Sequence, residues 1–135
     1  MSNPPNYEVF AVRYATRAAR RQQHFIGGDL HDGPMDVDYY LWVIRDRERL
    51  YIVDAGFDEA MAAKRKRKLL RNPKEALALL DIDTETVEHL IVTHLHYDHV
   101  GTFRDFPRAQ VYLQDDEQSR VSSRSILLQG PLAKP

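Results

Sequence analysis

A short apolar run followed at once by clustered histidines is the feature that most restricts how this sequence can fold. Leu90-Ile91-Val92 is typical of a buried strand. Four side chains able to bind a metal ion follow it directly: His94, His96, Asp98 and His99. Side chains two residues apart in extended backbone point to the same side, so His94 and His96 can converge. The pattern therefore predicts a buried strand that delivers polar groups together at its carboxyl end.

The residue types in this cluster indicate a metal site. Imidazole nitrogens and carboxylate oxygens are ligands of Zn²⁺ and of other first-row divalent metals. We expect His94 and His96 to bind one ion and Asp98 and His99 a neighbouring one, with Gly101 allowing a tight turn behind them. Random order would give this spacing with a probability on the order of one in a thousand. Histidines that cap the strand end without a metal remain the alternative.

The stretch from His94 to Gly101 resembles the metal-binding signature of the metallo-β-lactamase superfamily. Residues 39–44 are similar to the amino-terminal hairpin of that family, and residues 50–56, which contain Asp54, to its Asp-containing strand end. Within the superfamily, the sequence most resembles the N-acyl-homoserine lactonases, over about residues 7–117. The resemblance implies one half of an αββα sandwich, an α/β (α+β layered) fold with a mixed sheet and helices on one face.

The resemblance also implies a function and a division of the chain. Residues 1–117 correspond to the amino-terminal half of a family domain, and we expect residues 118–135 to form a poorly ordered tail. Family members are about twice as long, and their second half supplies further histidines and an Asp that bridges two metal ions. No His follows residue 117 here. The site of this chain is therefore expected to be incomplete, with weak metal affinity and little activity.

The expected activity is hydrolysis of a lactone, such as an N-acyl-homoserine lactone, or of another small ester by a metal-bound water. By resemblance the complete site holds two Zn²⁺ ions, and Asp98 lies near the attacking water and assists it. Asp54 is expected to hydrogen-bond the ligand segment or a ligand histidine, although it can also be a cap for a helix starting near Asp58. The alternative function is a non-catalytic, truncated module that binds metal or a partner protein.

Composition excludes some partners. The net charge of −1 does not favour a nucleic acid or an anionic membrane, and no apolar run is long enough to span a bilayer. The absence of cysteine is typical of a cytoplasmic protein with a His and carboxylate site. If half a sandwich is present, its inner face lacks a covering sheet, so we expect a homodimer or a partner that covers it.

Hydrophobic periodicity and turn residues predict the remaining elements. We expect strands at residues 7–15, 38–45, 49–54, 89–93 and 109–114, helices at 58–71 and from 73 onward, a capped turn at 83–88, and helical structure at 100–106. The five basic residues 64–68 are expected to lie on a solvated helix, and an anion-binding patch is the alternative. A long surface loop is expected at 16–38.

The long loop carries residues whose role the sequence leaves open. His24 and His31 are expected to be ordinary surface histidines, because neither has a partner at metal-ligand spacing. The alternative is that closure of the loop brings one of them to a metal ion as a further ligand. Phe25, Ile26 and Met35 either contact substrate or pack locally under the loop.

Overall fold

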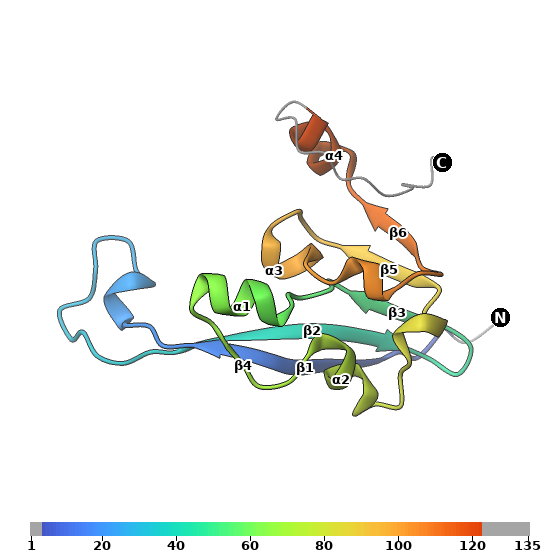
Figure 1. The fold of residues 1–135 in the computed structure, drawn as a ribbon, viewed down its shortest axis with the longest axis horizontal. Coiled ribbons are helices and arrows are strands. Elements are labelled where there is room, and N and C mark those ends of the chain that lie inside the picture. The colour runs from blue at the N-terminus through green and yellow to red at the C-terminus, as the bar shows by residue number, and fades with distance from the viewer. Residues whose placement is uncertain (1–3, 123–135) are drawn as a thin grey trace.

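The computed structural model describes residues 4–122 and contains one six-stranded mixed sheet (Figure 1). Its strands are β1 (Glu8–Arg17), β2 (Val37–Arg45), β3 (Leu50–Val53), β4 (Lys68–Leu69), β5 (His89–Val92) and β6 (Gln110–Leu113). The helices are α1 (Glu59–Arg65), α2 (Pro73–Ala78), α3 (Tyr97–Val100) and α4 (Asp115–Ser122), with short 3-10 turns η1 (Arg21–Gln23), η2 (Thr84–Thr86) and η3 (Phe103–Asp105). The layered α+β class expected from the sequence is confirmed.

The sheet topology brings several strand ends to one edge. The strand order is β4-β1-β2-β3-β5-β6; β1, β2 and β3 pair antiparallel, whereas β3, β5 and β6 pair parallel. Strands β1, β3 and β5 therefore end on the same side of the sheet, where β2 begins. We call this row of strand ends the site edge. In open α/β sheets, ligands bind beside such carboxyl ends of the strands.

One face of the sheet is buried and the other is open. Leu41 and Val43 are fully buried, whereas Trp42 between them is 45% exposed. Ala62 of α1 and Leu77 of α2 join the core on the buried face. We call the other side the open face; the alternation of side chains and the strand register place on it Val9, Ala11, Tyr40, Trp42, Ile44, Tyr51, Val53, His89, Ile91 and Tyr112.

The helix expected over residues 58–71 is shorter than the prediction. It begins after its cap Asp58, whose side chain accepts a hydrogen bond from the Met61 backbone N–H, and it ends at Lys66 in the left-handed conformation (φ 54°). The chain then turns back and residues 68–69 pair with β1 as β4. The basic run is therefore split between a helix end, a turn and an edge strand, and the expectation of one solvated helix is wrong.

The other expected elements agree with the structure to within a few residues. Asn72 caps α2, and the reciprocal hydrogen bond between the Glu75 side chain and the Asn72 backbone completes a capping box. α4 runs to Ser122, so the first residues of the expected tail are helical, and residues 123–135 lie outside the described part of the chain. In the described residues, none of the helices is long and apolar enough to cross a membrane.

Candidate functional site

The four predicted metal ligands lie together at the site edge, in the segment that follows β5. We call residues 93–101 the ligand loop. Backbone hydrogen bonds fasten it to the segment after β3: the Ala55 N–H donates to the His99 carbonyl at 2.7 Å, and the Gly101 N–H donates to the Gly56 carbonyl at 2.7 Å. The Thr102 hydroxyl donates to the Ala55 carbonyl at 2.5 Å. The ligand loop is thus positioned by the neighbouring strand end as well as by its own strand.

Asp54 is the side chain that joins these two segments. Its carboxylate accepts hydrogen bonds from the Thr93 backbone N–H at 2.9 Å and from the Thr93 hydroxyl at 2.9 and 3.0 Å. Nδ1 of His99 lies 2.7 Å from Oδ2 of the same carboxylate. Burial acts to raise the pKa of Asp54, but the hydrogen bonds from His99 and Thr93 outweigh it and hold that pKa below its ordinary value. Asp54 therefore stays anionic and fixes the start of the ligand loop together with one of its histidines.

His99 lies between two carboxylates. Besides Asp54 at Nδ1, it has Asp98 Oδ2 at 3.4 Å from Nε2. These two hydrogen bonds raise the pKa of His99 to about 9. The pKa of Asp98 lies below its usual range because the contact with His99 outweighs partial burial, which acts to raise it. His99 is thus held between two carboxylates, and these contacts favour the protonated ring.

His94 and His96 complete the cluster. The His94 ring centroid lies 3.8 Å from that of His99 and 4.6 Å from that of His96. Burial lowers the pKa of His94, and the neighbouring charges of His99 and His96 add to the effect. A neutral imidazole of this kind can donate an electron pair to a metal ion.

The donor chemistry of the cluster fits a divalent metal, but its present arrangement does not form a closed site. In residues 4–122, no group of three or more His, Asp or Glu side chains converges so that it could hold an ion. Both ring nitrogens of His99 face carboxylates, and the three rings pack against one another. The structure brings the four predicted residues together, with the His94 ring beside that of His96 and the Asp98 carboxylate beside His99.

An aromatic cluster that the sequence did not reveal supports the ligand loop. Ring centroids of Tyr14 and Tyr39 lie 5.1 and 5.2 Å from that of Phe57, which in turn lies 5.6 Å from that of Tyr97. The Tyr14 hydroxyl donates to the Asp98 carbonyl at 3.4 Å. Tyr97 stands in the sequence between two predicted ligands, yet its ring belongs to this cluster. Its position in the histidine motif was the only signal that could have singled it out.

The loop between β1 and β2 extends away from the body of the protein (Figure 1). Ion pairs between Arg20 and Asp32 and between Arg21 and Asp29 fasten it internally. Ile26 at its tip is fully exposed, so the expectation of local packing does not hold for this residue. His24 lies 3.0 Å from the Met35 carbonyl through Nε2, and neither loop histidine joins a metal-binding group among the described residues.

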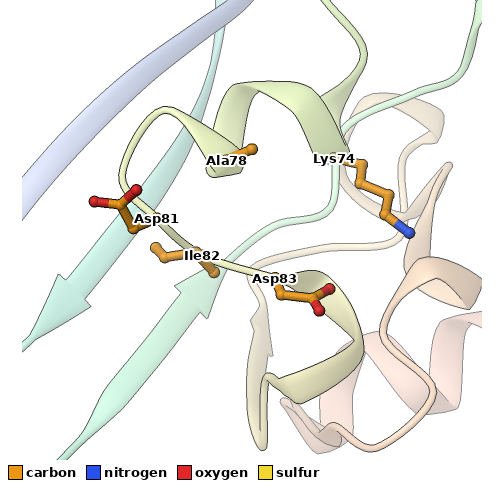
Figure 2. A pocket seen from close by; sticks show the side chains of 5 residues that line it. All are labelled: Lys74, Ala78, Asp81, Ile82 and Asp83. Carbon is orange, nitrogen blue, oxygen red and sulfur yellow. The ribbon is translucent and has the colours of Figure 1, made fainter.

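A shallow hollow elsewhere on the surface does not contribute to this site. Figure 2 shows its lining side chains, which come from α2 and the segment that follows it: Lys74, Ala78, Asp81, Ile82 and Asp83. This segment leads into the start of β5, whereas the ligand loop follows the end of the same strand. The hollow therefore lies toward the opposite edge of the sheet.

Comparison with known proteins gives one family match. Residues 36–114 match the family described as the Metallo-beta-lactamase superfamily. None of the curated proteins compared with this chain matches it.

Solved structures share the fold. A quorum-quenching N-acyl homoserine lactone lactonase superposes with a TM-score of 0.70 at 15% identity, over 93% of this chain and 52% of that one. A probable metal-dependent hydrolase from Staphylococcus aureus gives 0.67 at 14% identity, over 90% and 52%. AidC, a dizinc quorum-quenching lactonase solved with a product, gives 0.63 at 15% identity, over 87% and 45%. The present chain spans about half the length of these proteins, as its resemblance to one half of the fold implied.

Proposed function

Because this chain belongs to the metallo-beta-lactamase superfamily, we propose that it provides the first half of the site of a metal-dependent hydrolase that opens a lactone or another small ester. An N-acyl-homoserine lactone is the substrate favoured by the solved structures with the same fold, two of which are described as lactonases. The observation that carries the proposal is the ligand loop itself, whose four donors are held at the site edge by hydrogen bonds to Asp54, Ala55 and Gly56.

In the proposed site the residues of the chain would have distinct roles. His94, His96, Asp98 and His99 would hold divalent metal, with Zn²⁺ the ion we favour and two ions in a complete site. A metal ion bound here supplies a water of lowered pKa and polarises the substrate carbonyl. Asp98, as a carboxylate beside the proposed ions, would orient the attacking water or accept its proton. Asp54 would keep the ring of His99 in place through its contact with Nδ1.

The proposed metal ligands are fewer than a complete site needs, so we propose that a further stretch of polypeptide supplies the remaining ligands. Catalytic zinc sites use three protein ligands for each ion, and the pairs proposed here supply two. The open face of the sheet is the surface on which added chain would pack, and the similar structures contain about as much again beyond the matched part. For residues 1–135 alone we expect weak metal affinity and little turnover.

Metal analysis tests this function directly. We would measure the metal content of the purified chain after loading with Zn²⁺ and light dialysis, beside His96→Ala and a His24→Ala control. His24 lies in the β1–β2 loop, away from the proposed ligands. Because the expected affinity is weak, the chain and the control should retain part of the zinc under light dialysis, and His96→Ala should retain clearly less. Equal retention in all three would contradict the assignment. Lactone hydrolysis, measured on the same samples, shows whether this half works by itself.

The open face supports a second candidate, a non-catalytic interaction module. Tyr40 and Trp42 are 42% and 45% exposed, and Val9 is 60% exposed, on a face made largely of apolar side chains. For this candidate we commit to a second copy of the chain as the partner, because two open faces would bury each other. Light scattering should then show a dimer without metal or activity. A monodisperse monomer over a wide concentration range would exclude this candidate.

A further inference from the structure

Thr93, the first residue of the ligand loop, lies between groups whose hydrogen-bonding roles differ. Its hydroxyl oxygen lies 3.0 and 2.9 Å from the two carboxylate oxygens of Asp54. The same oxygen lies 3.0 Å from Nδ1 of His94 and 3.5 Å from Nδ1 of His99. Because a hydroxyl has one proton and two lone pairs, Thr93 can donate toward one of these groups and must accept from the others.

Asp54 is the acceptor in this arrangement, and its position is fixed by contacts other than the Thr93 hydroxyl. The Asp54 backbone N–H donates to the Ile91 carbonyl at 2.8 Å, and its φ of 64° is uncommon for a residue other than glycine. The residue is 5% exposed, and Nδ1 of His99 lies 2.7 Å from its Oδ2. Since an ionised carboxylate can only accept hydrogen bonds, both oxygens beside the Thr93 hydroxyl are acceptors.

The proton of the Thr93 hydroxyl therefore points to Asp54. If the hydroxyl donated to His94 instead, its lone pairs would face two carboxylate oxygens at 2.9 and 3.0 Å, and a hydrogen bond to a charged group would be lost. Toward His94 the Thr93 oxygen is then an acceptor, so Nδ1 of His94 carries a ring proton. This assignment holds for the neutral ring and for the imidazolium alike, so it does not depend on the titration of His94.

We propose that Thr93 is a positioning residue, which donates to Asp54, accepts from Nδ1 of His94 and thereby leaves Nε2 of His94 to bind a metal ion. Histidines that bind metal usually donate their other ring N–H to a fixed acceptor, and that contact sets both the tautomer and the orientation of the ring. Asp54 would thus orient two histidines, His99 by direct contact and His94 through Thr93. The inference rests on the proposed function, in which His94 is a ligand, and extends it to the nitrogen that binds.

A purely local role for Thr93 is the competing explanation. Its backbone N–H and hydroxyl would then serve only to hold the turn against Asp54, and water would be the partner of the half-buried His94 ring. Under this explanation, removing the hydroxyl leaves the tautomer of His94 unchanged. The tautomer of one ring therefore separates the two explanations.

Long-range proton–nitrogen NMR correlation shows which nitrogen of a neutral histidine carries the proton. We would record it on the chain stripped of metal, at about pH 8, above the ordinary histidine pKa of about 6.5. His94 should carry its proton on Nδ1 in the unmodified chain and in Thr93→Ser, whereas Thr93→Val, which lacks the hydroxyl, should lose this preference. His24 is the internal control, because the Met35 carbonyl oxygen, 3.0 Å from Nε2, requires the proton on that nitrogen.

Zinc affinity gives a second readout. Loss of an outer contact to a ligand histidine typically weakens metal binding about 10–100-fold, so Thr93→Val should bind Zn²⁺ at least about tenfold more weakly than the unmodified chain. Thr93→Ser should recover most of this loss. Thr86→Val is the matched control, because the Thr86 hydroxyl donates to the Asp83 carbonyl at 2.8 Å, before the start of β5, and its loss should leave zinc affinity unchanged.

Three results would overturn the proposal: a His94 proton on Nε2 in the unmodified chain, an unchanged His94 tautomer in Thr93→Val, or equal zinc affinity in these two proteins. The first result needs no variant, so the test stands even if Thr93→Val fails to fold. The tautomer is measured without metal or turnover. A chain that shows the expected tautomers but binds no zinc would refute the proposed function and leave the hydrogen-bond path from Asp54 to His94 standing.

Discussion

Replacing Gly101 by alanine should loosen the ligand loop through a purely steric effect. A Cβ atom at this position would lie 2.6 Å from the Gly56 carbonyl oxygen, 2.7 Å from the Phe57 Cα and 2.8 Å from the Tyr97 carbonyl oxygen. All three are backbone atoms, so no side chain can rotate away. The φ of Gly101 is −63°, a value that alanine adopts freely, so backbone strain does not contribute.

The magnitude follows from two costs and one gain. Overpacking of a tight contact costs ~1–3 kcal/mol. Moving the ligand loop outward also weakens the hydrogen bond from the Gly101 N–H to the Gly56 carbonyl, worth ~0.5–1.5 kcal/mol. Replacing Gly by Ala lowers the entropy of the unfolded chain and returns ~0.4–1 kcal/mol. We expect Gly101→Ala to lower the free energy of unfolding by ~0.5–4 kcal/mol.

Urea unfolding monitored by circular dichroism measures this loss, with Gly33→Ala as the matched control. A Cβ at Gly33 meets no atom within 4 Å, and its φ is not in the left-handed region. The control should therefore keep or slightly raise the stability of the chain. Equal midpoints for the two variants, or a loss below about 0.5 kcal/mol for Gly101→Ala, would refute the close approach of the ligand loop to the segment after β3.

Three further predictions follow from single features of the structure. Thr102→Val removes the buried hydroxyl that donates to the Ala55 carbonyl and should lower the free energy of unfolding by ~1–3 kcal/mol in the same urea assay, whereas a neutral result would exclude this hydrogen bond. Trp42→Lys, on the open face, should reduce the self-association measured by light scattering. The urea midpoint should change little, because Trp42 is 45% exposed. Unchanged self-association would mean that the contact between copies lies elsewhere on the surface. Hydrogen bonds from the His31 and Gln22 backbones, and ion pairs with Arg21 and Arg20, lower the pKa values of Asp29 and Asp32 respectively. The two carboxylates therefore stabilise the β1–β2 loop above the ordinary carboxyl pKa of about 3.9, and this stabilisation is lost as pH falls through the lowered pKa values. On acidification, amide hydrogen exchange should accordingly become faster in the loop before it does so in the core. If loop and core lost their protection from exchange at the same pH, this assignment would be contradicted.

Sequence-based prediction succeeded where the signal is local. Alternation in β2, the Asn72 cap and the apolar run of β5 each depend on neighbouring residues, so they could be identified without the fold. The end of the first helix was missed because Lys66 adopts a left-handed conformation that is uncommon for lysine, and because pairing with β1 draws the following residues into the sheet.

The sequence by itself determined that His94, His96, Asp98 and His99 gather after one buried strand, because all four fall within six residues of one another. Only the tertiary structure decided what surrounds them. Asp54 meets His99 across 45 positions of the chain, and Arg67 meets Tyr97 across 30. Contacts of this kind arise when strands from different parts of the chain share one sheet edge, and no local pattern encodes which side chains that edge brings together.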